Sequence, residues 1–184
     1  LGFCIAPGSE PQRYTTQSTN GTQMTSSKMA QLIEASENQN VRAFLKMLRH
    51  GEGTDHADGY RTLFGGSFFD SCNDHPGQVI TAKLGGKPIR SSAAGAYQFL
   101  RVTWSNLVIQ YGFEDFSPKS QDLACIALII GRGALKNVID GDFERAVIKC
   151  NREWASLPYS PYGQPTVTMD LAKQLYSDAG GSFA

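Results

Sequence analysis

The sequence predicts an α+β fold, mainly helical, with a small β lobe and a cleft between the two lobes. Residues 41–48 have helical spacing, with one apolar stripe formed by Val41, Phe44, Leu45 and Leu48. Residues 60–90 instead carry glycine pairs, Pro76-Gly77 and short β-prone pieces such as residues 79–81. Helical spacing returns from residue 91 onward. One helix, a turn-rich β element and several further helices therefore make up the expected order.

Length and charge limit the classes of function. The 184 residues suit one compact domain, and 17 basic and 17 acidic residues give a formal net charge of zero. We therefore expect no binding to nucleic acid and no attraction to an anionic membrane surface. The longest apolar run, residues 123–130, is far shorter than the roughly 18 residues of a membrane span. We expect no membrane-spanning segment.

The first part of the chain differs in composition from the rest. Residues 8–27 are rich in Ser, Thr, Gln, Asn and Gly, and Leu1 to Ala6 fit the tail of an apolar export segment. We predict a polar leader or linker over residues 1–37, containing a short helix capped by Thr25 or Ser26. A catalytic domain is expected over residues 38–184.

Capping residues mark the later helices. Thr103 is expected to cap a helix with an apolar stripe, Ser117 and Pro118 to open the apolar helix that follows, and Asp142 to cap a third. A final helix carries Met169, Leu171, Ala172 and Leu175 and is expected to stop at Gly180-Gly181.

The four cysteines are candidates for disulfide bonds, and the cysteines and the three histidines are candidate metal ligands. No Cys or His grouping has metal-site spacing, so we expect no metal, and we interpret His50, His56 and His75 as solvated loop residues. Four cysteines allow three pairings. We predict Cys125–Cys150, on two apolar helical stretches, and with it Cys4–Cys72; four free thiols are the alternative.

Glu52 is the candidate catalytic residue. It stands between Gly51 and Gly53 at the predicted end of the helix that contains residues 41–48. Glycine neighbours have no Cβ, so the side chain can tilt toward a cleft. A partly desolvated carboxylic acid in that position suits general acid chemistry. The alternative is a solvated glutamate in a surface turn.

Two other segments supply candidate binding residues. Ser91 to Phe99 combines small residues with Tyr97 and Gln98, which offer stacking and amide hydrogen bonds; the alternative is a glycine-containing turn with core aromatics. Trp154 and Tyr162, the latter in Tyr162-Gly-Gln164, line a sugar cleft or close the core. Residues 115–122 are interpreted as a structural helix start.

Seven motifs occur in a recognisable order: FLKMLRHGEGTD, DHP, GAYQ, DFSPKSQD, RGAL, WASLP and YGQ. In this order they resemble the phage lambda type of endolysin, a peptidoglycan-degrading lytic transglycosylase with a lysozyme-like fold. The resemblance runs from about Val41 to Gly181 and leaves the leader outside. It implies a lysozyme-like fold for this chain.

The resemblance also implies roles for residues of this chain. Glu52 takes the place of the single catalytic glutamate, and no cofactor is implied. The substrate is the glycan strand of bacterial peptidoglycan, cleaved in the periplasm during host lysis by a protein that we expect to be monomeric. The candidate substrate-binding residues, taken from the residue types in these segments, are Ser91, Tyr97, Gln98, Trp154, Tyr162 and Gln164.

Two alternatives remain open. Phage-T4-type lysozymes have a second catalytic residue nine positions after the glutamate, where this chain has Arg61. A hydrolytic muramidase would therefore need Asp55, Asp58, Asp70 or Asp74, none singled out by its spacing. A non-catalytic peptidoglycan-binding module is the alternative from a different class of protein.

Overall fold

The computed structural model describes residues 20–84 and 87–184 and confirms the α+β class. Its helices and strands are α1 (Asn20–Ser36), α2 (Gln39–Gly51), β1 (Ile80–Leu84), β2 (Lys87–Ser91), α3 (Arg101–Tyr111), α4 (Pro118–Gly131), α5 (Leu135–Asp140), α6 (Phe143–Cys150) and α7 (Met169–Asp178), with a short 3₁₀ turn at Gly59–Arg61. None of the described helices is both long enough and apolar enough to cross a membrane.

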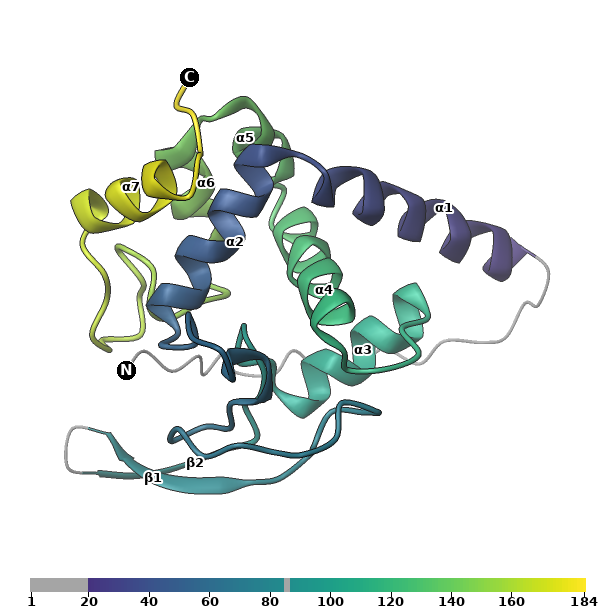
Figure 1. Cartoon of the computed structure of the whole chain (residues 1–184), viewed down its shortest axis with the longest axis vertical. Coiled ribbons are helices and arrows are strands. Elements are labelled where there is room, and N and C mark those ends of the chain that lie inside the picture. The colour runs from purple at the N-terminus through teal and green to yellow at the C-terminus, as the bar shows by residue number, and fades with distance from the viewer. Residues whose placement is uncertain (1–19, 85–86) are drawn as a thin grey trace.

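The two lobes differ in architecture (Figure 1). β1 and β2 pair antiparallel, with Ile80 opposite Ser91 and Leu84 opposite Lys87, and form the lower edge of the molecule in this view. The helices stack above them, with α5, α6 and α7 grouped on one side and α1 extending on the other. α2 packs against α7 and α5 and runs down toward the β lobe, so its C-terminal end lies where the lobes meet.

α2 has a capped first turn and a buried apolar stripe. The Asn38 side chain accepts hydrogen bonds from the backbone N–H groups of Asn40 and Val41, which caps the first turn. Every residue of the predicted apolar stripe is buried. Burial of one such side chain contributes roughly 1.5–3 kcal/mol. The stripe therefore fixes how α2 is rotated, and with it where the residue after the helix points.

α1 is longer than the short helix predicted for the leader. It begins at Asn20 rather than at Thr25 or Ser26, and it packs against α4 and α3. Leu32 is fully buried in the same core as α2. The polar composition of its first half hid this helix, because only its second half carries apolar residues at helical spacing. Residues 1–19 lie outside the described part of the chain.

The later helices begin close to where they were predicted, with two corrections. Ser117 caps α4 by accepting from the Ser120 N–H, and Pro118 is the first residue of that helix. α3 begins at Arg101, before Thr103, because its N-cap is Leu100, an extended residue whose carbonyl accepts from the Trp104 N–H. α5 was not predicted, since its six residues are too few to show a helical period. α7 begins after Thr168, which accepts from the Leu171 N–H, and ends at Asp178.

The predicted Cys125–Cys150 bridge is wrong. Cys72, Cys125 and Cys150 carry free thiols, and Cys4, the other half of the predicted Cys4–Cys72 bridge, lies outside the described residues. Cys125 and Cys150 are both buried in the core as small apolar side chains. Burial raises the pKa of Cys150 to about 12, so this thiol stays protonated.

The interpretation of His75 as a solvated loop residue is also wrong. His50 and His56 are exposed as expected, but His75 is only 8% exposed. Its Nε2 lies 2.8 Å from the Phe99 carbonyl oxygen, and its Nδ1 accepts from the Gly77 N–H at 3.0 Å. These contacts fit the neutral ring that donates through Nε2. His75 thereby joins the segment before β1 to the segment before α3.

We expect His75 to make the stability of the fold depend on pH. Burial lowers the pKa of His75 below its usual value near 6.5, so the unfolded chain binds this proton more readily than the folded one. Stability from the neutral ring is present above about pH 6.5 and is lost as pH falls through the lower folded pKa. Urea unfolding of the wild type and of His75→Gln between pH 5 and 8 measures this, with a stability difference that shrinks toward low pH. A difference that is constant over this range would contradict the prediction.

Candidate active site

Glu52 is the residue that ends α2. Its backbone N–H still donates to the Leu48 carbonyl at 2.9 Å, and its φ of −78° and ψ of −4° continue the helical conformation. Its side chain is only 2% exposed. The solvated turn that was the alternative for Glu52 is therefore not what forms. The burial of α2 carries the glutamate into the junction between the lobes.

Ser156 is the polar side chain against Glu52. Its hydroxyl donates to Glu52 Oε1 at 2.5 Å, across 104 residues of sequence, and Ser156 is itself 1% exposed. A side chain at position 51 would compete for this space, since a Cβ at Gly51 would lie 2.9 Å from Ser156 Oγ. The first glycine beside Glu52 thus has a packing role, while Gly53 has the positive φ of 72° that turns the chain away from the helix.

Thr54 attaches the loop after Glu52 to the β lobe. The side chain of this fully buried residue donates to the Ala96 carbonyl at 2.5 Å, and its oxygen lies 3.1 Å from the Arg49 carbonyl. Gly59 lies directly beneath this loop, since a Cβ at Gly59 would come within 1.8 Å of the Thr54 carbonyl oxygen. The loop is therefore held from both lobes.

Tyr97 and Gln98 lie beside this joint, inside the protein. Each is 2% exposed, which leaves no ring face of Tyr97 for a sugar and favours the core alternative for this residue. The Tyr97 hydroxyl donates to Asp122 Oδ1 at 2.6 Å. Gln98 has a φ of 51° and donates from Nε2 to the carbonyls of Thr62 and Gly95. Its Oε1 is buried without a hydrogen-bond partner among the described residues.

The other predicted binding residues divide into two groups. Ser91 is buried and accepts from the Ala93 N–H, and Trp154 is 1% exposed in the core. Tyr162 and Gln164 are half-buried on the segment that follows Ser156. The Tyr162 hydroxyl donates to the Arg152 carbonyl, and Gln164 Oε1 has no hydrogen-bond partner in the described part of the chain. Of the six predicted binding residues, only Tyr162 and Gln164 are partly exposed to solvent.

Ser156 and Thr54 were missed as site residues. Ser156 lies in the WASLP motif and Thr54 in the EGT motif, so the motifs contained the signal without assigning a role. A contact across 104 residues has no local pattern that could reveal it. Burial and pairing are properties of the folded chain.

Metal binding has no support in the described residues. They contain no group of three or more His, Cys, Asp or Glu side chains arranged to hold an ion. The aspartates near Glu52 in sequence have other contacts. Asp55 lies 3.9 Å from Arg49, Asp58 is ion-paired with Arg61 at 2.5 Å, and Asp74 accepts from the His75 N–H.

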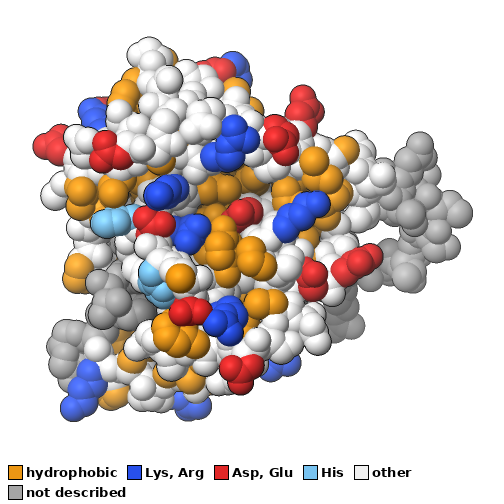
Figure 2. Space-filling view, viewed as in Figure 1, with side chains coloured by type: hydrophobic (Ala, Val, Ile, Leu, Met, Phe, Trp, Pro, Cys, Tyr) orange, Lys and Arg blue, Asp and Glu red, His pale blue; other side chains and the backbone are white. Residues whose placement is uncertain are grey.

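The charge distribution agrees with the balanced composition. Figure 2 shows acidic and basic side chains interspersed over one face, with hydrophobic side chains gathered across its middle. No single sign of charge dominates this face.

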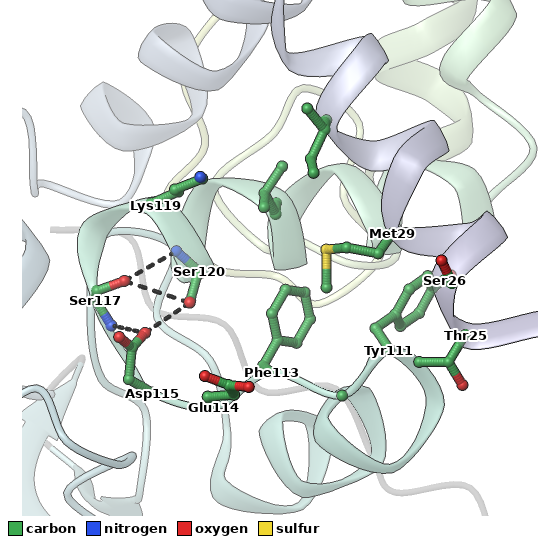
Figure 3. A pocket seen from close by; sticks show the side chains of 13 residues that line it. Thr25, Ser26, Met29, Tyr111, Phe113, Glu114, Asp115, Ser117, Lys119 and Ser120 are labelled. Atoms are coloured by element: carbon green, nitrogen blue, oxygen red, sulfur yellow. Dashed lines mark hydrogen bonds between the residues drawn. The ribbon is translucent and has the colours of Figure 1, made fainter. Parts of the chain in front are cut away.

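A groove of about 840 Å³ lies away from these residues, between α1, α3 and α4 (Figure 3). Met29, Phe113 and Leu123 supply apolar lining, while Asp115, Ser117 and Ser120 form a hydrogen-bonded rim. None of the predicted site residues lines it. Although this groove is large, it is not the candidate active site, because Glu52 and the predicted binding residues lie outside its lining.

The fold and its buried helix-end glutamate define a lysozyme-like protein. Bacteriophage lambda lysozyme complexed with a chitohexasaccharide matches with a TM-score of 0.74 and 37% identity, over 80% of this chain and 97% of that one. A second structure of lysozyme from bacteriophage lambda matches with a TM-score of 0.70 and 36% identity, over 80% of this chain and 97% of that chain.

Sequence comparison identifies the family within this class. The family model described as Endolysin matches residues 42–183. The endolysin of Escherichia phage lambda is 38% identical over 151 residues, covering 79% of this chain and 94% of that protein. The endolysin of Escherichia phage P2 is 37% identical over 155 residues, covering 78% and 94%. The chain belongs to the endolysin family of peptidoglycan-degrading phage enzymes.

We expect Gly59→Ala to destabilise the protein strongly. The added methyl group cannot fit 1.8 Å from the Thr54 carbonyl, so the loop after Glu52 has to shift, at a cost of about 1–3 kcal/mol or more. Gly131→Ala is the matched control, because a Cβ there meets nothing within 4 Å. Its effect should stay within about 0.5 kcal/mol. Equal unfolding free energies of the two variants in urea titrations would show that the contact does not constrain the loop.

Proposed function

We propose that this endolysin is a lytic transglycosylase that cleaves the β-1,4 bond between N-acetylmuramic acid and N-acetylglucosamine in peptidoglycan. The observation that carries the proposal is the burial of Glu52. Among residues whose exposure is described, it is the only Asp or Glu in the buried class. Burial disfavours the charged form of a carboxylic acid, as a general acid requires.

Glu52 acts twice in the proposed reaction. As the acid it donates its proton to the glycosidic oxygen, so that the bond to C1 of the muramic acid breaks. As the carboxylate it then takes the proton from the C6 hydroxyl of the same sugar, whose oxygen bonds to C1. The product is a 1,6-anhydro end, and water is not consumed. Because the nucleophile belongs to the sugar, it is already positioned, and no second carboxylate is needed to hold a water molecule.

The surroundings of the nearby aspartates support the use of a single acid. Asp55 and Asp58 face Arg49 and Arg61, and Asp74 caps the backbone at His75. Each of these contacts gives its carboxylate a local structural role. A hydrolytic muramidase, the alternative, would need one of these groups or the exposed Asp70 to activate a water molecule.

Substrate binding is proposed for the segment after Ser156. Tyr162 and Gln164 are both half-buried there; Tyr162 offers part of a ring, whereas Gln164 Oε1 is enclosed by the protein, so Gln164 would contribute through the rest of its side chain. The lambda lysozyme of similar structure was solved with a chitohexasaccharide, which supports an oligosaccharide as the ligand here. We propose that Ser91, Tyr97, Gln98 and Trp154 contribute by shaping the backbone of the site rather than by stacking on sugars. The site of action is the peptidoglycan of the host periplasm.

We expect Glu52→Gln to abolish cell-wall lysis while the protein stays folded. The amide is nearly isosteric with the acid but can neither donate nor take back this proton, and general acid–base catalysis is worth about 10²–10⁴-fold. Turbidity loss of purified peptidoglycan measures the rate, and Asp140→Asn, which changes an exposed carboxylate on α5, is the control. Activity of Glu52→Gln within a few-fold of wild type would remove Glu52 from the mechanism.

The released sugars decide between the two reactions. Mass spectrometry of the products should find 1,6-anhydro ends, which are lighter than hydrolysed ends by one water. Free reducing ends together with inactivity of an aspartate variant, Asp55→Asn, Asp58→Asn, Asp70→Asn or Asp74→Asn, would establish the hydrolase instead. Binding of glycan strands without either product would identify a binding module.

We expect Ser156→Ala to lower turnover by about 10-fold or more. The hydroxyl group holds Glu52 Oε1, and a hydrogen bond to a charged group is worth about 1.5–3 kcal/mol. Ser105→Ala, whose hydroxyl donates to a carbonyl on the exposed side of α3, is the matched control. If both variants cleave solubilised glycan strands at the same kcat, the Ser156 contact has no catalytic role.

A further inference from the structure

Asp122, in the first half of α4, accepts hydrogen bonds from two tyrosines of the β lobe. The Tyr60 hydroxyl lies 2.8 Å and the Tyr97 hydroxyl 2.6 Å from the same oxygen, Oδ1. Tyr60 belongs to the 3₁₀ turn and Tyr97 to the segment before α3. One carboxylate of the helical lobe therefore holds two separate segments of the small lobe.

Arg49 extends this cluster to the loop after Glu52. Its guanidinium carbon lies 4.6 Å from the centre of the Tyr60 ring, and its Nη1 donates to the Tyr60 hydroxyl at 3.3 Å. Its Nη2 donates to the Thr54 carbonyl at 3.4 Å. Arg49 stands in the last turn of α2, three residues before Glu52. The Arg49 side chain thus connects Tyr60 to Thr54. Arg49 lies before Glu52 in the chain and Thr54 lies after it, so these contacts span the segment that carries the glutamate.

Gln121, next to Asp122, makes a second connection. Its Oε1 accepts from the Ala96 N–H at 2.8 Å, and its Nε2 donates to the Tyr60 carbonyl at 3.0 Å. The Ala96 carbonyl in turn accepts from the Thr54 side chain. Two neighbouring residues of α4 therefore reach the loop after Glu52 by two routes, one through Tyr60 and Arg49 and one through Ala96.

We infer that Asp122 is a positioning residue for Glu52, acting through Tyr60 and Arg49 on one side and through Tyr97 and the Ala96–Thr54 contact on the other. The inference rests on the proposed catalytic role of Glu52. The carboxylate fixes two hydroxyl groups at once, and a displacement of the acid by about 1 Å can cost about 100-fold in rate. Asp122 itself has no contact with the reacting atoms in this scheme.

The chemistry of the cluster requires a carboxylate. Hydrogen bonds to a charged acceptor are shorter and about twice as strong as those between neutral groups, in keeping with the 2.6 and 2.8 Å distances. Burial raises the pKa of Tyr60 to about 12 and that of Tyr97 well above its usual value. Both tyrosines therefore remain donors at neutral pH. Asparagine at position 122 would keep an oxygen acceptor but lose the charge that attracts Arg49.

The test compares Asp122→Asn, Tyr60→Phe and Tyr97→Phe with Asp140→Asn, whose carboxylate forms an exposed ion pair with Lys136 on α5. We expect Asp122→Asn to lower kcat on solubilised glycan strands about 10–100-fold with KM within about 2-fold, at a temperature where the variant is fully folded. Each tyrosine variant should lose less, and adding Tyr60→Phe to Asp122→Asn should cost little more. Asp140→Asn should match the wild type.

A purely structural role gives a different result. It would lower the unfolding temperature of Asp122→Asn without changing kcat per folded molecule, and that outcome would overturn the inference, as would a raised KM with unchanged kcat. Asp122→Asn in the Glu52→Gln background separates this inference from the proposed function. No further loss of residual activity is expected if Asp122 acts through Glu52, and a further loss of about 10-fold would refute it. If Asp122→Asn does not fold, the two single-atom tyrosine deletions decide by the same kcat criterion.

Discussion

The carboxyl group of Glu52 is buried at the end of α2, and this burial is a constraint that the neighbouring segments have to meet. Burying an ionisable group costs free energy unless its surroundings supply hydrogen bonds, and Ser156 supplies one from a segment 104 residues away. The burial itself comes from α2, whose apolar stripe fixes the rotation of the helix. The packing of α2 in the core therefore also sets the position of the Glu52 side chain.

Connections between the lobes follow from this constraint. In the loop after Glu52, the Thr54 hydroxyl donates a hydrogen bond to the Ala96 carbonyl in the segment before α3. Gln121 and Asp122 then attach that segment and the 3₁₀ turn to α4. A small lobe with only one two-stranded sheet in its described part has little core of its own, so these polar contacts supply much of its fixed orientation.

Much of this arrangement could be predicted from the sequence, but not its pairings. The stripe of α2, the Ser117-Pro118 start of α4 and the turn-rich β lobe were predictable because each depends on neighbouring residues. Buried His75 was interpreted as solvated, and Cys125 and Cys150 were paired as a disulfide, because the local sequence does not record what a residue packs against. The helix predicted for the leader was shorter than α1, because the first half of α1 is polar and shows no apolar residues at helical spacing.

The motifs that identify the family mark structural contacts as often as chemistry. Tyr97, Trp154 and Asp122 all lie in motifs of the resemblance, yet Tyr97 and Trp154 are buried and Asp122 binds two tyrosines. The motif strings alone do not separate residues that could touch a ligand from residues that hold another side chain. Assigning roles therefore requires burial and hydrogen-bond partners. In this protein they show that Glu52 is buried against Ser156 and that Tyr97 and Asp122 are joined to each other inside the protein.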